Sequence, residues 1–198
     1  HPDSVTFVRS LEEDLMRRDF TINALAVNDK EEIVDYFGGI EDLEKEIICC
    51  VGNPMERFNE DALRMMRAVR FAGQLGFTIE SDTFNAIRTL KANLERVAVE
   101  RMKVEFEKMI LSPHRALAFK AFVESELYHS CPDFKEAKET LLKLGEFPLE
   151  KMTITQAWIL FAYYEQLTVP QLRKVLKDWK SSNDQISTIL TGYQTLLA

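Results

Sequence analysis

The 198-residue sequence has few cysteines and histidines, three of each, and neither kind is spaced as a metal site. Cys49, Cys50 and Cys131 form no CxxC pair, and the histidines lack metal-ligand spacing. These absences disfavour structural zinc and a disulfide framework, and they predict a reduced protein. In the stretch EIICCVG (residues 46–52) the thiols are expected to act as small buried apolar groups.

Long apolar runs and a surplus of positive charge are also missing. The longest apolar run, residues 157–164, is much shorter than the roughly 20 residues that cross a bilayer, which predicts a soluble cytoplasmic protein with no membrane partner. A net charge of −7 disfavours a protein that coats nucleic acid nonspecifically. Any contact with RNA must therefore come from concentrated basic sites.

The N-terminus has neither an initiator methionine nor a signal-peptide pattern, since the chain starts with HPDSVTFVRS. We therefore expect a fragment of a longer protein. With 46% apolar residues, the chain is nevertheless long enough to build a substantial core.

The first 50 residues predict mixed structure. A short helix follows Ser10, a hairpin turns at Asn28 and Asp29, and Gly38-Gly39 interrupts the chain. Residues 46–52 have the character of a strand.

Beyond this stretch, caps and prolines predict one helix after another. The expected starts and stops are Asn53-Pro54, a cap at Ser81, Ser112-Pro113, a stop at Gly145, caps at Thr153 and Thr168, and SSND at 181–184. The predicted fold class is mainly α, with helical domains preceded by a small α/β part. We expect domains at 1–39, 40–111 and 112–198.

The stretch RFNEDALRMMRAVRF (residues 57–71) is the most distinctive. Read as one helix at about 100° per residue, it places four charged side chains on one arc and apolar residues opposite, with Arg70 at the edge of the arc. The four are Glu60, Asp61, Arg64 and Arg67.

Two interpretations of this arc stay open. One is a solvated face with ion pairs from Glu60 and Asp61 to Arg64, each worth about 0.2–0.5 kcal/mol. The other is nucleotide recognition, because every basic residue in this stretch is arginine, whose planar guanidinium suits bidentate contacts. A carboxylate beside a guanidinium matches the amine and ring nitrogen that adenine and cytosine present, and mismatches guanine and uracil.

Four motifs together resemble the bacterial class II tRNA nucleotidyltransferases, the family of CCA-adding enzymes. They are RRDFTINALA at 17–26, DYFGG at 35–39, RFNEDALRMMRAVRF at 57–71 and VERMKVEFEKM at 99–109. The resemblance covers the first 110 residues and implies the end of a nucleotidyltransferase head (1–39), a nucleotide-selecting neck (40–111) and a helical body (112–198) that contacts the tRNA acceptor arm.

The resemblance also implies residue roles. Asp61 and Arg64 would pair with the base of CTP or ATP, with Glu60 holding Arg64. Arg67 and Arg70 would be further nucleotide contacts, Arg18 would reach the nucleotide, and Asp19 would bind the ribose. The motif at 99–109, including Glu100, Arg101 and Glu105, implies bracing between helices.

The family's Mg²⁺ ions are held by a DxD pair, and this sequence contains no DxD. The segment most similar to this motif, Glu12-Glu13-Asp14, is better explained as an exposed acidic turn than as a metal site. We therefore expect no catalytic or metal-binding residue in this chain, and no incorporation of CMP or AMP by this polypeptide alone.

A second basic segment, RKVLKDWK at 173–180, places Arg173, Lys177 and Lys180 on one face beside Trp179. It is either an RNA phosphate contact or a solvated amphipathic helix whose Trp packs inward.

Related functions remain possible at this point: a bacterial poly(A) polymerase, an enzyme that adds only CC or only A, or a noncatalytic helical RNA-binding scaffold. Ala62-Leu63 after the Glu-Asp pair favours the CCA-adding enzyme over the polymerase, whose relatives tend to carry proline there. Family members often dimerise, so a homodimer is also an expectation.

Overall fold

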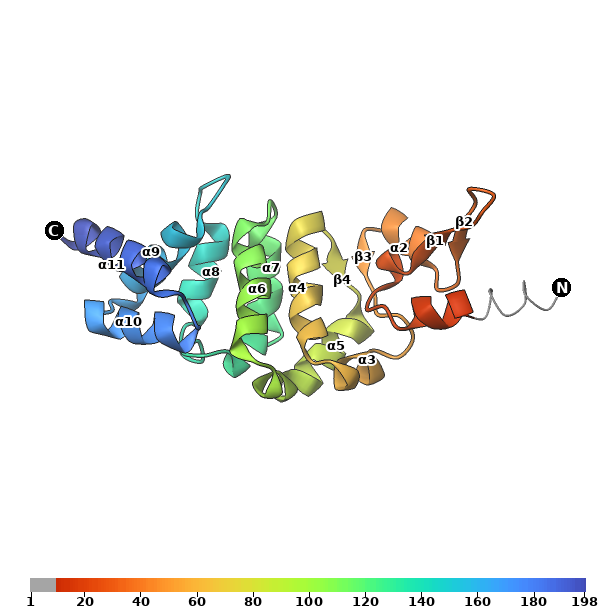
Figure 1. Cartoon of the computed structure of the whole chain (residues 1–198), viewed down its shortest axis with the longest axis horizontal. Helices are drawn as coiled ribbons and strands as arrows, with labels where there is room; N and C mark the ends of the chain where they lie inside the picture. The colour runs from red at the N-terminus through yellow and green to blue at the C-terminus, as the bar shows by residue number, and fades with distance from the viewer. Residues whose placement is uncertain (1–9) are drawn as a thin grey trace.

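A computed structural model describes residues 10–198 and shows an elongated molecule, with the N-terminal part at one end and the C-terminal helices at the other (Figure 1). Helices α4, α6 and α7 stand side by side in its middle. The expected mainly α fold class is confirmed.

The N-terminal part is a small α/β unit. Residues 10–16 are helical, and the expected start of this helix at Ser10 borders the residues that the structure leaves undescribed. The predicted hairpin forms from two antiparallel strands, in which Leu25 pairs with Asp35. Its turn depends on Asn28, whose Oδ1 accepts from the amides of Lys30 and Glu32. The elements are η1 (Thr21–Asn23), β1 (Leu25–Val27), β2 (Ile33–Asp35) and α2 (Gly39–Glu44).

The middle of the chain joins two short strands to a series of helices. β3 and β4 pair in parallel, Ile47 with Thr78 and Ile48 with Ile79, so the predicted strand at 46–52 is confirmed in its first half. The elements are β3 (Ile47–Ile48), α3 (Pro54–Glu60), α4 (Leu63–Leu75), β4 (Thr78–Ile79), α5 (Ser81–Leu90), η2 (Lys91–Arg96) and α6 (Val99–Leu111).

The remaining elements are helical. They are α7 (Arg115–Glu124), η3 (Leu127–Ser130), α8 (Lys138–Glu146), α9 (Ile154–Glu165), α10 (Val169–Asp178) and α11 (Asn183–Leu197). None of the described helices is long and apolar enough to cross a membrane.

Most predicted helix starts are confirmed. Asn53 caps α3, and Pro54 is the first residue of this helix. Thr153 forms a capping box with Gln156, and Thr168 forms one with Gln171. Ser182, within SSND, caps α11.

Three expected boundaries were wrong. Glu80, not Ser81, caps α5, because its carboxylate reaches the amides of Asp82 and Thr83. α7 begins at Arg115, two residues after Pro113. Gly145 lies inside α8, where it lets the helix approach Phe119 rather than ending it.

One buried apolar cluster extends from Phe20 to Tyr193 and crosses both predicted domain boundaries. At its C-terminal end, Phe106, Phe134 and Trp179 pack with ring centroids 4.9 to 5.1 Å apart. Trp179 is fully buried and donates to the carbonyl of Pro132 at 2.9 Å, so its side chain packs inward. The division into three domains stays a prediction.

The close packing of α4 on α7 depends on Gly73. A Cβ there would lie 2.5 Å from Ser112 Oγ and 2.7 Å from Ala118 Cβ. Gly73→Ala is expected to lower the free energy of unfolding by about 1–3 kcal/mol through overpacking. This loss would occur even though alanine is more favourable than glycine in a helix interior by about 1 kcal/mol. Urea unfolding of the chain measures this change.

Gly192→Ala in α11 is the matched control. Its nearest neighbour is the flexible end of Ile159, which can move aside, so stability should be unchanged or higher. Equal effects of the two substitutions would contradict the packing argument.

Candidate nucleotide-binding site

Five of the six residues predicted to bind nucleotide line one pocket. It has a volume of about 430 Å³, within the range of roughly 300–1,000 Å³ typical of small-molecule sites. Its lining contains five arginines against two aspartates, a local positive excess on an acidic chain. The lining residues are Arg17, Arg18, Asp19, Asn23, Asp61, Leu63, Arg64, Arg67 and Arg101.

The expectation of one continuous helix over 57–71 was wrong. α3 ends at Glu60, Asp61 is extended (φ −150°, ψ 105°), and α4 begins at Leu63. The cause is Asp61 itself, whose Oδ1 accepts from the amide of Leu63 at 3.1 Å. Aspartate favours such capping over helix interiors, because its short side chain competes for backbone donors.

Arg64 is held in place by three hydrogen bonds. Its Nη1 donates to Glu60 Oε2 at 2.8 Å and to the carbonyl of Arg57 at 3.2 Å, and its Nη2 donates to the carbonyl of Arg17 at 3.0 Å. Glu60 is shared, because its other oxygen lies 2.6 Å from Arg57 Nη2. Glu60 therefore contacts Arg64 as expected and fixes it relative to α3.

Asp61 does not pair with Arg64, although the solvated-face interpretation had expected this ion pair. Its Oδ2 accepts from Arg101 Nη2 of α6 at 3.0 Å. The side chain of Arg101 is 54% exposed and that of Asp61 is 33% exposed, so this carboxylate stays accessible from the pocket. Arg101 thus joins α6 to the α3–α4 junction.

Asp19 and Arg67 form the inner wall of the pocket. Asp19 is buried, its Oδ1 accepts from Asn23 Nδ2 at 2.7 Å and from the amide of Phe20, and its Oδ2 accepts from Arg67 Nε. Burial disfavours the charge of Arg67, but the hydrogen bond and charge of Asp19, together with the charges of Glu105 and Asp61, outweigh it and raise the Arg67 pKa. Arg67 therefore keeps its charge in a half-buried place.

Arg18 is the most available of the predicted contacts. Its side chain is 50% exposed, one Nη donates to the carbonyl of Asn23 at 3.2 Å, and Asp14 lies 4.0 Å away. Such an exposed, weakly held guanidinium can turn toward an anionic ligand.

Arg70 lies outside the pocket lining. It is buried, its Nε donates to Glu105 Oε2 of α6 at 2.5 Å, and its guanidinium stacks 4.4 Å from the ring centre of Phe71. A buried ion pair between α4 and α6 favours a bracing role over the expected nucleotide contact. Glu105 thus joins α6 to α4, and the bracing expected of its motif stays a prediction.

The second predicted basic cluster lies on and just after α10, near the C-terminal end of the molecule (Figure 1). Arg173 and Lys177 line a groove between α10 and α11. Lys180 is not among the lining residues, because the chain leaves α10 at Asp178 and Lys180 takes a left-handed conformation (φ 59°).

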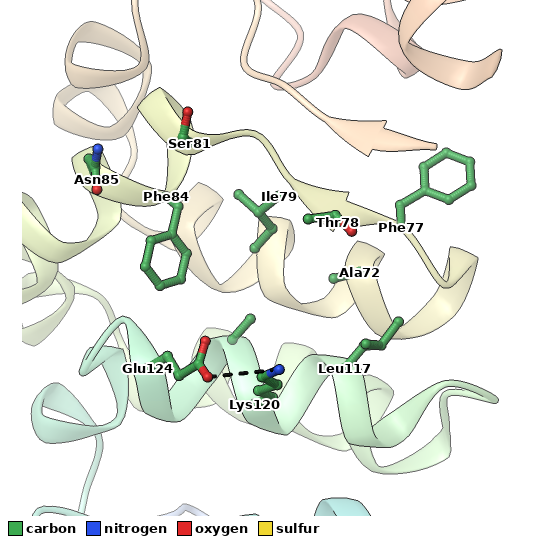
Figure 2. A pocket seen from close by; sticks show the side chains of 11 residues that line it. Ala72, Phe77, Thr78, Ile79, Ser81, Phe84, Asn85, Leu117, Lys120 and Glu124 are labelled. Carbon is green, nitrogen blue, oxygen red and sulfur yellow. Dashed lines mark ion pairs between the residues drawn. The ribbon is translucent and has the colours of Figure 1, made fainter. Parts of the chain in front are cut away.

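A third pocket, of about 360 Å³, is mostly apolar (Figure 2). Phe77, Ile79 and Phe84 line one side, and Leu117 of α7 lies across from them. Its one lysine, Lys120, pairs with Glu124 at 4.0 Å. Without uncompensated positive charge, it does not suit a polyphosphate.

The thiols and carboxylates of the described residues offer little redox or metal chemistry. Burial raises the pKa of Cys49 to about 11 and that of Cys50 to about 12, so neither is a thiolate near neutral pH. No group of three or more His, Cys, Asp or Glu within residues 10–198 is arranged to hold a metal ion.

Sequence reasoning missed four lining residues, which are Arg17, Asn23, Leu63 and Arg101. Arg17 and Asn23 belong to the recognised RRDFTINALA motif, but only their neighbours were singled out. Arg101 was assigned to bracing, and its partner Asp61, 40 positions away, has no local signal in the sequence.

Comparisons with known proteins cover nearly the whole chain. Family models match at residues 1–49, "Poly A polymerase head domain", and at residues 76–138, "Probable RNA and SrmB- binding site of polymerase A". A CCA-adding enzyme of Pediococcus pentosaceus is 47% identical over 98% of this chain and 50% of its own length. One of Limosilactobacillus fermentum is 50% identical over 95% of this chain and 47% of its own length.

The structure of a Bacillus stearothermophilus CCA-adding enzyme in complex with CTP has the same fold. It matches with a TM-score of 0.88 and 36% identity, over 94% of this chain and 47% of that one. The chain thus spans about half the length of the relatives it matches. These matches show that the chain belongs to the bacterial class II tRNA nucleotidyltransferases, the family of the CCA-adding enzymes.

Proposed function

We propose that this chain is the nucleotide-selecting part of a cytoplasmic enzyme that adds CCA to the 3′ ends of tRNA from CTP and ATP. The observation that carries the proposal is the pocket in which Asp61 and Arg64 are both fixed by neighbours and both keep unused hydrogen-bonding capacity. The names of the relatives support the choice of substrates.

Arg64 has donors to spare. A guanidinium carries five N–H groups, and the described contacts of Arg64 use three of them. The remaining N–H groups suit an acceptor nitrogen on a base. Because the other bonds hold the side chain in place beforehand, base binding costs little side-chain entropy.

Asp61 has acceptor sites to spare. A carboxylate accepts about four hydrogen bonds, and the amide of Leu63 and Arg101 account for one on each oxygen. An exocyclic amine of cytosine or adenine fits the remaining sites. Guanine and uracil present a carbonyl and a ring N–H instead, which would place acceptor against acceptor and donor against donor.

The remaining pocket residues suit the ribose and the phosphates. Arg18 and Arg67 supply positive charge for the triphosphate, and in this proposal the carboxylate of Asp19 accepts from a ribose hydroxyl. Asn23 and Arg67 fix Asp19 in its place.

Mg²⁺ is part of the proposed activity of the whole enzyme, since nucleotidyltransferases generally use a divalent metal. The described residues do not form a fitting site for the ion. The residues of this chain are therefore proposed to bind and select the nucleotide, with no chemical step assigned to them.

The test is to titrate the full-length protein with CTP, ATP, GTP and UTP. The proposal expects CTP and ATP to bind more tightly than GTP and UTP, because each good bidentate base contact gives about 1–3 kcal/mol of discrimination. Equal binding of all four would contradict the proposal and favour a helical RNA-binding scaffold.

Poly(A) polymerase is a second candidate, because the matching family models carry the names of polymerase domains. Incubation of the full-length protein with tRNA lacking its 3′ end, ATP and CTP separates the candidates by product length. Three added nucleotides support the proposal, a long A tail supports the polymerase, and one or two nucleotides support a CC- or A-adding relative.

A further inference from the structure

Arg57 in α3 is a nearly buried arginine outside the nucleotide pocket. Its side chain is 12% exposed, and it is not among the residues that line the pocket. A nucleotide in the pocket therefore does not account for it. Arg57 lies three positions before Glu60, the residue that contacts Arg64, so the two side chains are neighbours on the surface of α3.

The guanidinium of Arg57 joins two parts of the chain that are far apart in the sequence. Its Nη1 donates to the carbonyl of Met16 at 3.0 Å, at the C-terminal end of the helix formed by residues 10–16. Its Nη2 lies 2.6 Å from Glu60 Oε1, and Glu56 is a more distant neighbour at 3.8 Å. A guanidinium makes both close contacts at once, because its N–H groups are fixed in one plane. Arg57 thus connects α3 to the N-terminal unit.

Arg64 makes the same two kinds of contact from the other side of Glu60. Its Nη1 donates to Glu60 Oε2 at 2.8 Å, and its Nη2 donates to the carbonyl of Arg17 at 3.0 Å. Because Met16 and Arg17 are adjacent, the contacts of Arg57, Glu60 and Arg64 form a closed ring. Cations suit this position, since the last carbonyls of a helix are unpaired and carry partial negative charge.

Local stability alone does not explain an arginine at position 57. Its Nε is buried and has no hydrogen-bond partner among residues 10–198. A buried donor without a partner is costly, and an apolar side chain of similar length avoids that cost. The side chain of Glu60 is 48% exposed, so water can solvate its carboxylate if Arg57 is absent. What the arginine adds is a fixed position for Glu60.

We propose that Arg57 is a positioning residue for base selection, which acts on Arg64 through Glu60. This inference rests on the proposed function, in which Arg64 donates to the ring nitrogen of cytosine or adenine. Arg57 keeps Glu60 from turning into solvent, so Arg64 is already oriented when the base arrives. Without Arg57, binding of the base has to order Arg64, and this ordering lowers the affinity.

The loss of affinity is expected for two of the four nucleotides. CTP and ATP engage Arg64 in the proposed site, whereas GTP and UTP present an N–H there and do not engage it. Arg57→Met in the full-length protein should therefore weaken binding of CTP and ATP by about twofold to tenfold, the range for ordering one side chain. Binding of GTP and UTP should be unchanged. Equilibrium titration with each nucleotide measures this, and a parallel loss for all four would overturn the inference.

Arg57→Lys is the conservative variant. An ammonium can pair with Glu60, but it is a point charge without the planar geometry that directs one contact to Glu60 and another to Met16. The preference for CTP and ATP should lie between those of the parent and of Arg57→Met. If the methionine variant does not fold, a lysine variant with the full parental preference overturns the inference by itself.

Arg115→Met is the matched control. Arg115 of α7 is also a buried arginine bonded to backbone carbonyls, since it donates to those of Leu144, Phe147 and Leu149. It is not among the residues that line the pocket. Its substitution should lower the stability of the protein and leave the ratio of the four affinities as in the parent. An equal loss of preference in Arg115→Met would assign the effect to a weakened fold and overturn the inference.

Combination with Arg64→Ala tests whether Arg57 acts through Arg64. In that background Arg57→Met should change the nucleotide preference no further, because the side chain that it positions is gone. A further loss of the same size would overturn the inference. Failure of the proposed function is distinguishable, because the parent would then bind all four nucleotides equally. Failure of this inference alone leaves the parent selective and Arg57→Met equally selective.

Discussion

Arg64→Ala in the full-length protein is expected to remove most of the preference for CTP and ATP over GTP and UTP. The loss should be about 5-fold to 150-fold in the ratio of dissociation constants, the equivalent of about 1–3 kcal/mol for one bidentate base contact. The variant loses the donor that meets the ring nitrogen, and Glu60 loses its hydrogen-bond partner on α4. Equilibrium titration with the four nucleotides measures the effect.

Arg88→Ala is the control for this prediction. Arg88 is also a helical arginine, but it is exposed and pairs with Glu126, away from the pocket. Its substitution should leave the order and the ratio of the four affinities unchanged. A parent preference that survives Arg64→Ala undiminished would show that other residues read the base.

Glu105→Ala is expected to lower the free energy of unfolding of the chain by about 3–5 kcal/mol. Glu105 and Arg70 are both buried and joined at 2.5 Å, and removal of the carboxylate leaves the guanidinium charge inside the protein without its partner. Arg70 keeps Gln74 and the stacking on Phe71, neither of which carries a compensating charge. Urea unfolding followed by circular dichroism gives the free energy.

Two further variants separate the buried pair from a general effect of alanine. Glu124→Ala removes an exposed helical glutamate from a 4.0 Å pair with Lys120 and should cost no more than about 1 kcal/mol. Arg70→Met with Glu105→Leu removes both charges and should be more stable than Glu105→Ala alone. If Glu105→Ala costs as little as Glu124→Ala, the ion pair between α4 and α6 is not a brace.

Local rules predicted much of the fold, because many elements carry their own signals. The capping boxes at Thr153 and Thr168 need only side chains three residues apart, and the hairpin needs only Asn28 and its neighbours. Such short-range hydrogen bonds can be recognised in a sequence, and the structure contains them.

The nucleotide pocket was predictable only in part. Periodicity assumed a continuous helix at 57–71, but Asp61 accepts from the amide of Leu63 and divides the segment. The resemblance identified Arg18, Asp19 and Arg64 as a group, although they belong to two motifs far apart in the sequence. Partnerships such as Arg101 with Asp61 depend on how α6 packs against the α3–α4 junction, which no local pattern encodes.

Arg70 illustrates a further limit of pattern reasoning. Three arginines at successive steps of three look alike in the sequence, yet Arg64 and Arg67 line the pocket and Arg70 is buried against Glu105. Each step of three residues turns a helix by about 300°, so the third side chain points away from the first. Burial then decides its role.

In the proposed site, Asp61 accepts a hydrogen bond from the exocyclic amine of the base. The most direct test compares CTP with the analogue that lacks only the 4-amino group, in the parent full-length protein and in Asp61→Ala. The Asp61→Ala substitution also removes the hydrogen bonds of Asp61 to the start of α4 and to Arg101. These side effects act equally on CTP and on the analogue, so they cancel in the ratio of the two affinities. The account predicts that the parent prefers CTP by about tenfold and that Asp61→Ala binds both ligands equally. A preference for CTP that is equally large in Asp61→Ala would contradict it.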